Sequence, residues 1–185
     1  SKRYSSAICY VNELLEVNPY WKGLWSRKIE LYELQGNTVE SNRLRKRLSQ
    51  IYPKDSKVQE DYLYNTELQA NALRKQGKID EAISLTSDLL KKQPENPSHY
   101  LTLVNDHLKT GDYYSALAFA ERGLIQFPGN LSLINKKSGI LAEQKRYDEL
   151  IPFLQDQMKF GNRAALQQQY NYYLLEAARS AKDKD

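Results

Sequence analysis

Cysteine is almost absent from this sequence, which has a single one, Cys9, among 185 residues. One cysteine excludes an internal disulfide bond and excludes a metal site built from several thiolates. Cys9 lies among Ala7, Ile8 and Val11. We therefore interpret it as a small buried hydrophobic side chain and not as a reactive thiol.

Long hydrophobic runs are also missing. No apolar stretch approaches the roughly 20 residues that a transmembrane helix needs, and none near the start resembles a secretory signal. We therefore expect no membrane contact through this segment. Nothing in the sequence assigns a compartment, so the cytoplasm, the bacterial periplasm and the cell envelope all stay open.

Residue patterns typical of catalysis do not occur. The two histidines, His99 and His107, are eight residues apart, too far for the i, i+4 pair of a helical metal site. There is no glycine-rich phosphate loop, nucleophile elbow or zinc-type spacing. The sequence therefore predicts a chain that is not an enzyme and that holds no metal and no small-molecule cofactor.

Charge of one sign is only slightly in excess, because 27 basic and 23 acidic residues give a net charge of +4. This balance is too mild to indicate a nucleic-acid or membrane partner. Basic residues are concentrated only in "NRLRKRL", which carries Arg43, Arg45, Lys46 and Arg47. We interpret this stretch as a solvated helix face, with a phosphate-contacting patch as the alternative.

The sequence does have an internal period. "GKIDEAISLTSDLLKKQPEN" starts at Gly77 and "GDYYSALAFAERGLIQFPGN" starts at Gly111, 34 positions later, with glycine, alanine, proline and asparagine in register. The same frame extends forward to "KRYDELIPFLQDQMKFGN" and backward to "QGNTVESNRLRKRLSQIYPKD". Each unit is predicted to be helix, turn, helix, with a glycine after the first helix and a proline after the second.

Packing explains which positions recur. Two antiparallel helices joined by a short turn cannot bury their apolar faces alone, so consecutive pairs must stack. Positions where helices approach closely admit only small residues. We therefore expect Ala7, Ser41, Ala82 and Ala116 to lie at close helix contacts.

These units resemble the tetratricopeptide repeat, a helix-turn-helix unit of 34 residues. The matches are aromatic, small or proline residues at the positions where that pattern has them: Trp25, Tyr32 and Tyr100; Ala7, Ala70, Ala82, Ala116 and Ser138; Pro19, Pro53, Pro94 and Pro128. Ile29, Val104, Arg45 and Leu150 depart from the pattern. The resemblance implies an all-α fold, a right-handed superhelical solenoid of antiparallel helix pairs.

The frame divides the chain into a single array. Truncated repeats lie at residues 1–21, a second helix, and at residues 165–185, a first helix, and complete repeats at 22–55, 56–96, 97–130 and 131–164. Because both ends fall inside repeats, we expect a fragment of a longer repeat protein.

The repeat at 56–96 carries a seven-residue insertion at its start. Ser56 and Gln59 have the spacing of a capping box, so we expect the first helix of this repeat to begin early, at Ser56. An irregular loop is the alternative.

The resemblance implies a non-enzymatic scaffold that binds proteins or peptides, with first helices lining a concave groove. Candidate groove residues are polar or basic residues of the predicted first helices: Asn71, Arg74, Lys75, Asn105, Lys109 and Lys136. Amides that recur at equal repeat positions suit a peptide backbone, and basic side chains favour an acidic ligand. Solvated polar residues without a binding role are the alternative.

The carboxylate clamp, by which some members of this family bind acidic carboxy-terminal tails of chaperones, is not expected. In register with that clamp the chain has Glu67, Asn71, Thr102, Ser132 and Lys136. Only the second and the last of these match, and Glu67 would repel an acidic tail.

Two further functions stay open. In the first, the chain is a regulatory or sensor segment attached to a catalytic, DNA-binding or cell-envelope domain. In the second, it binds RNA through the basic stretch and some of its 14 tyrosines. We rank RNA last, because most tyrosines are predicted at turn or interior positions of the repeats.

Overall fold

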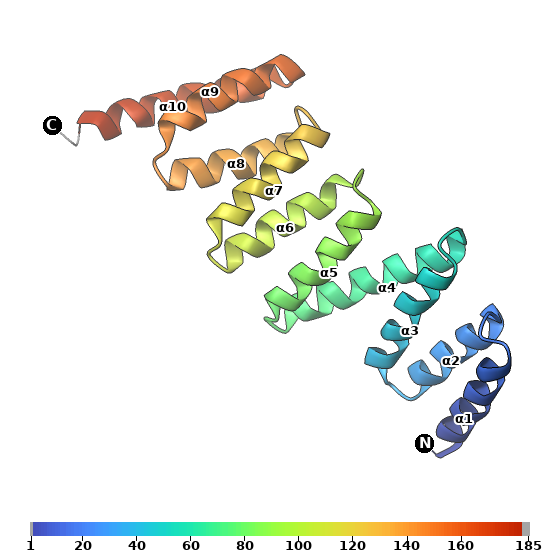
Figure 1. Ribbon diagram of the computed structural model, residues 1–185. Helices are drawn as coiled ribbons and strands as arrows, with labels where there is room; N and C mark the ends of the chain where they lie inside the picture. Colours follow the sequence, from blue (N-terminus) through green and yellow to red (C-terminus); the bar gives the residue numbers. More distant parts are fainter. Residues whose placement is uncertain (1, 183–185) are drawn as a thin grey trace. The chain divides into compact units, whose positions relative to one another are not determined.

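The computed structural model describes residues 2–182, and almost all of these residues are helical (Figure 1). The α-helices of this part are α1 (Lys2–Val17), α2 (Lys22–Leu34), α3 (Thr38–Ile51), α4 (Ser56–Lys75), α5 (Ile79–Lys92), α6 (Pro97–Lys109), α7 (Tyr113–Gln126), α8 (Leu131–Glu143), α9 (Tyr147–Gln157) and α10 (Arg163–Lys182). A 3-10 turn, η1 (Met158–Phe160), lies between the last two helices. The predicted all-α class is confirmed, since these residues contain no strand.

The chain forms two compact units, which we call the amino-terminal unit (residues 1–72) and the carboxy-terminal unit (residues 73–185). Their boundary falls within α4. In the amino-terminal unit α1 packs on α2 and α2 on α3, and in the carboxy-terminal unit each helix from α5 to α10 packs on the next. Contact between sequential helices is what antiparallel pairs with short connections require. The further division into repeats remains a prediction.

The turn inside each helix pair uses a left-handed residue at the same repeat position. Gly36, Gly77 and Gly111 have φ angles of 73°, 77° and 77°, a conformation that glycine adopts at little cost. The last repeat has no glycine there, and Lys145 adopts a φ of 55° instead. The last helix pair therefore forms the same left-handed turn without a glycine.

The insertion before the second complete repeat lengthens a helix and does not form a loop, because α4 begins at Ser56. The predicted capping box is wrong in detail. Asp55 caps the helix, accepting a hydrogen bond from the Val58 amide at 3.1 Å. The Gln59 side chain instead donates to the carbonyl oxygens of Ser49 and Tyr52, at 2.7 and 3.0 Å.

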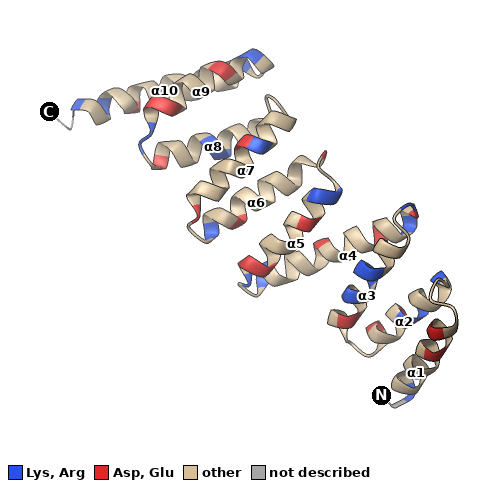
Figure 2. Ribbon diagram, viewed as in Figure 1, with Lys and Arg blue, Asp and Glu red and all other residues tan. Residues whose placement is uncertain are grey.

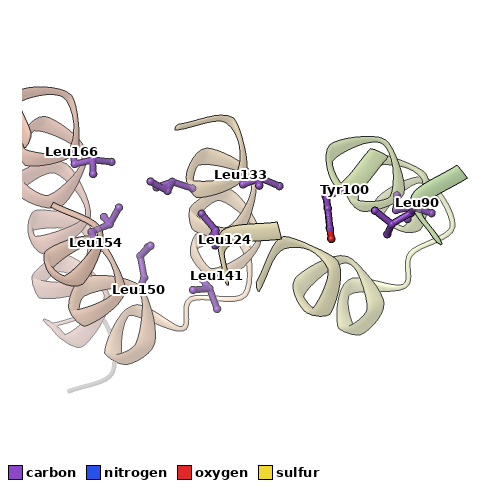
Figure 3. Packing of buried hydrophobic residues seen from close by; sticks show 10 residues of the cluster. Leu90, Tyr100, Leu124, Leu133, Leu141, Leu150, Leu154 and Leu166 are labelled. Atoms are coloured by element: carbon purple, nitrogen blue, oxygen red, sulfur yellow. The ribbon is translucent and has the colours of Figure 1, made fainter. Parts of the chain in front are cut away.

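Each unit has its own hydrophobic core. The core of the amino-terminal unit is formed by apolar residues of α1 to α4, including Ile8, Trp25 and Leu44. In the carboxy-terminal unit one cluster extends from Leu90 on α5 to Leu166 on α10, and Figure 3 shows these side chains. Stacking of successive helix pairs therefore supplies the apolar contacts within each unit, as the repeat pattern requires.

The small residues behave largely as predicted. Ala82 and Ala116 are fully buried and Ser41 is almost so, whereas Ala7 is only partly buried. The prediction for Cys9 is wrong, since this residue is exposed. The core face of α1 is formed by Ile8, Val11 and Leu15. Cys9 lies about 100° around the helix from Ile8 and therefore points away from this face.

Two glycines inside helices provide a test of this packing. A Cβ atom at Gly123 would lie 2.8 Å from Leu133 Cδ1 and 3.1 Å from Tyr100 Cβ, whereas a Cβ at Gly139 would meet nothing within 4 Å. Gly139→Ala should therefore raise the free energy of unfolding by about 0.5 to 1 kcal/mol, through helix propensity alone. Gly123→Ala should lower the free energy of unfolding by about 1 kcal/mol, because the steric clash costs more than the helix propensity gains. Urea unfolding of both variants measures the difference, and equal effects would contradict the close contact at Gly123.

Candidate functional site

The six predicted groove residues are divided between the two units. Asn71 lies in the amino-terminal unit, on α4, and is exposed. The other five lie in the carboxy-terminal unit, on the last turn of α4, on α6 and on α8. We therefore describe the site of the carboxy-terminal unit by itself.

Arg74, which was predicted to line the groove, forms an internal ion pair instead. Its Nε donates to Asp106 Oδ1 and Oδ2 at 3.1 and 2.8 Å, and its Nη2 lies 2.8 Å from Oδ2. The two side chains are only 14% and 2% exposed. Arg74 Nη2 also donates to Thr86 Oγ1, which donates to the Ala82 carbonyl at 2.9 Å. One guanidinium therefore joins the end of α4 to α5 and α6.

Arg45 has the same role in the amino-terminal unit, although the sequence placed it on a solvated face. Its side chain is 8% exposed, with Nη2 2.5 Å from Glu33 Oε1 and Nε 2.9 Å from Asp61 Oδ2. The arginine thus links α3 to α2 and α4. A buried cation is stable only when it is paired and hydrogen-bonded, and this pairing explains why a charge replaces the usual aromatic residue here.

Four predicted residues of the carboxy-terminal unit stay available for a ligand. Within residues 2–182, Lys75, Asn105, Lys109 and Lys136 have no ion-pair or hydrogen-bond partner for their side chains. Asn105 and Lys109 are four residues apart on α6 and so share a face of it. Helix α6 contacts α8, which carries Lys136. We call these four residues the polar set.

A polar contact between first helices was missed by the sequence reasoning. Gln169 Nε2 on α10 donates to Asn135 Oδ1 on α8 at 2.6 Å. The other oxygen of this pair, Gln169 Oε1, is buried and has no partner in the part of the chain that the structure describes. The two residues are 34 positions apart, so the repeat period itself was the signal that could have revealed the contact.

Three cations of the basic stretch are exposed, as predicted, and they line a hollow. Arg43, Lys46 and Arg47 of α3 line a hollow of about 430 Å³ together with Lys28 of α2. Figure 2 shows the blue segments of α3 that carry these cations. Lys28 was not singled out from the sequence, because it lies on a different helix and its approach to α3 depends on tertiary packing.

Both histidines make internal contacts. Its ring stacks on Phe119 with a centroid distance of 5.4 Å, and its Nδ1 lies 3.3 Å from Asp112 Oδ2. Asp112 also caps α7, and its hydrogen bonds with Ser115, followed by the charge of His107, lower the pKa of this carboxyl. His99 is buried beside Gln93.

Residues 2–182 contain neither a metal-binding cluster nor a membrane-spanning helix. No group of three or more histidine, cysteine, aspartate or glutamate side chains could hold a metal ion there. None of the helices in this range combines the length and the apolar character that crossing a bilayer needs.

No family model and no curated protein matches the sequence. Among solved structures, the TPR2AB domain of yeast Sti1 in complex with pHSP90 has a TM-score of 0.50 and 12% identity, covering 96% of this chain and 80% of that one. The chain has a tetratricopeptide-repeat fold. The fold likeness extends to MamA, with a TM-score of 0.49, 12% identity and coverage of 88% and 91%. It also extends to YrrB, described as a TPR protein with an unusual peptide-binding site, with a TM-score of 0.47, 10% identity and coverage of 92% and 84%.

Removing one partner of the buried pair Arg74 and Asp106 should be costly. Asp106→Ala leaves the Arg74 guanidinium buried without its carboxylate, and should lower the free energy of unfolding by about 3 to 5 kcal/mol. Thr86→Val removes only the hydroxyl contact of Arg74 and should cost about 1 kcal/mol. Asp156→Ala is the matched control, because Asp156 pairs with exposed Lys159 at 2.7 Å, and should cost under about 1 kcal/mol. Chemical denaturation measures all three, and equal losses for Asp106→Ala and Asp156→Ala would show that the pair does not stabilise the unit.

Proposed function

We propose that this chain is a non-enzymatic module that binds a protein or peptide, and that its carboxy-terminal unit binds an acidic segment through the polar set. The observation that carries the proposal is that Lys75, Asn105, Lys109 and Lys136 lack internal partners in the described residues. The two arginines that the sequence placed among basic surface groups, Arg45 and Arg74, do have such partners. The polar set thus differs from these arginines in that its side chains are not used in internal pairs.

The chemistry of the set suits a peptide with carboxylate side chains. An ammonium group forms charge-assisted hydrogen bonds with a carboxylate, which are stronger than neutral ones. The Asn105 amide both donates and accepts, and so matches a peptide unit. Because Asn105 and Lys109 share a face of α6, a single extended segment crossing this helix would reach both an amide and a cation.

The pHSP90 bound by the TPR2AB domain of yeast Sti1 is not the ligand that we propose. A fold likeness at 12% identity carries no binding residues with it, and function depends on the residues placed on the fold. The residue in the first clamp position is Glu67, which is exposed on α4 and would oppose an acidic tail there. The proposed ligand is therefore defined by its acidic side chains and not by a carboxy-terminal tail.

A selection from random short peptides displayed on phage tests the proposal with the intact chain as bait. Selected peptides should be enriched in Asp and Glu over the starting library. A selected peptide should then lose affinity about tenfold for the Lys109→Gln, Lys136→Gln double variant, equivalent to about 1.4 kcal/mol. Fluorescence polarisation measures the change, and thermal unfolding should stay within about 0.5 kcal/mol because both residues lie outside the core.

The matched control removes the same charge elsewhere. Lys91 and Lys159 are both highly exposed, with side chains 76% and 72% accessible, and each pairs only locally along the chain. The Lys91→Gln, Lys159→Gln variant should change the affinity less than about twofold, since exposed local pairs have little effect. Equal losses in the two double variants, or peptides without acidic enrichment, would refute the site.

A further inference from the structure

A hollow of about 360 Å³ lies in the amino-terminal unit, lined by residues of α2, α3 and α4, and we call it the α2–α4 hollow. Its apolar lining comes from Ile29, Leu48 and Val58, which are 5%, 4% and 8% exposed. These three side chains belong to the hydrophobic core of the unit, so part of the wall of the hollow is packed interior. The polar set does not line this hollow.

The charged side chains of the lining are equal in number, three basic and three acidic, but they are not equally paired. Lys22 Nζ lies 2.6 Å from Asp55 Oδ2. Glu30 Oε2 lies 2.6 Å from Arg27 Nη1. The two partners, Asp55 and Arg27, do not line the hollow, yet they neutralise one charge of each sign in its lining. Two basic and two acidic side chains of the lining remain.

One buried arginine is shared by two carboxylates of the hollow. Arg45 Nη2 lies 2.5 Å from Glu33 Oε1, and Arg45 Nε lies 2.9 Å from Asp61 Oδ2. The Glu33 and Asp61 side chains are 45% and 49% exposed. Within residues 2–182, Glu33 Oε2 has no hydrogen-bond partner, and Asp61 Oδ1 accepts only from Asn65 Nδ2 at 3.0 Å. The three groups therefore carry one uncompensated negative charge, with acceptor positions open to a ligand.

The remaining cation of the lining does not cancel this excess by contact. Lys57 is exposed and has no ion-pair partner in the part of the chain that the structure describes. It precedes Asp61 by four residues on α4, so the two side chains share a face of the helix. A lysine four residues before an acid is the less favourable order for such a pair. Lys57 thus lies near the excess carboxylate without binding it, and it would repel a second cation.

We propose that the α2–α4 hollow binds a lysine side chain of a protein partner. The methylene groups of a lysine can cover Ile29 and Val58 while the ammonium group reaches the carboxylates. A cation is favoured because its charge balances the negative excess of the hollow. An ammonium group suits two acceptors on different helices better than a guanidinium, whose planar fork matches a single carboxylate. The inference takes from the proposed function only that the partner is a protein.

A divalent metal ion suits the hollow less well than an organic cation. Ca²⁺ takes six to eight oxygen ligands, and residues 2–182 contain no group of three or more acidic, histidine or cysteine side chains that could hold a metal ion. The apolar part of the lining gives a second reason, because methylene groups can cover it and a hydrated ion cannot. The chemistry of the hollow therefore favours a cation with an apolar stem.

Titration of a blocked lysine, N-acetyl-lysine N-methylamide, into the intact chain tests the proposal by nuclear magnetic resonance. The blocked lysine has a peptide bond on each side, as in a protein. It should shift the backbone amide signals of Ile29 and Val58 with saturation, because both residues line the hollow. The norleucine analogue has an apolar stem without the charge and should shift neither signal. Sodium chloride keeps the ionic strength constant.

Two substitutions on α4 should change the affinity in opposite directions. Asp61→Asn removes the excess charge and leaves the arginine paired with its other carboxylate, so the blocked lysine should bind about fivefold more weakly. Lys57→Gln removes a repelling cation and should strengthen binding about threefold. Asp156→Asn and Lys159→Gln make the same charge changes at an exposed pair of the other unit, and each should alter the affinity less than about twofold.

The outcomes separate the proposal from its alternatives. Saturable shifts that require the lysine charge, and that weaken with Asp61→Asn and strengthen with Lys57→Gln, support it whatever becomes of the acidic-peptide site. Circular dichroism checks that each variant is folded, and Lys57→Gln keeps the test decisive if Asp61→Asn is not. Equal responses to the lysine and norleucine analogues, or weaker binding to Lys57→Gln, overturn the proposal. Tighter binding of n-butylamine, the side chain alone, overturns the protein source and favours a small amine.

Discussion

Every helix pair in this chain has apolar faces that its own two helices cannot cover, and covering them determines the positions of nearly all other groups. Gly123 allows α7 to approach Tyr100 and Leu133 closely enough that a single methyl group would collide with them. Ala82 and Ala116 are fully buried for the same reason. Once helices are held this close, a polar side chain between them must find a partner or leave the interior.

The chemistry of that interior changes along the chain at two repeat positions. The residues three before and nine after the left-handed turn residue are Glu33 and Arg45, Arg74 and Thr86, Leu108 and Ala120, and Ala142 and Leu154. In each of the first two pairs the two side chains are polar and contact each other. The arginine is on the second helix in the first pair and on the first helix in the next. The last two pairs are apolar. A buried ion pair is weak evidence for stability, whereas apolar layers contribute through burial. The later repeats thus rely more fully on hydrophobic stacking.

The sequence predicts the packing positions well because several independent signals agree on them. Helical periodicity, the turn glycines and the small residues all lead to the same elements, and the turn survives even where Lys145 replaces glycine. The helix start at Ser56 was also predictable, although its cap was not. The exposure of Cys9 was misjudged because apolar sequence neighbours are not spatial neighbours on a helix. Periodicity therefore predicts which face of a helix is buried, whereas the burial of a single residue depends on its angle around the helix axis.

The fate of each cation could not be predicted in the same way, since pairing depends on which carboxylate tertiary structure brings near. Arg74 and Asp106 are 32 residues apart, so the 34-residue period does not place them at equal repeat positions. Arg45 and Arg47 are only two residues apart, yet one is buried between two carboxylates and the other covers an indole ring. Basic residues of a helical repeat thus divide into those that internal acids neutralise, which stabilise the stack, and those left in excess. Only the second group has charge to offer a partner, because a cation that gave up a buried carboxylate would leave that carboxylate unpaired at a cost of several kcal/mol.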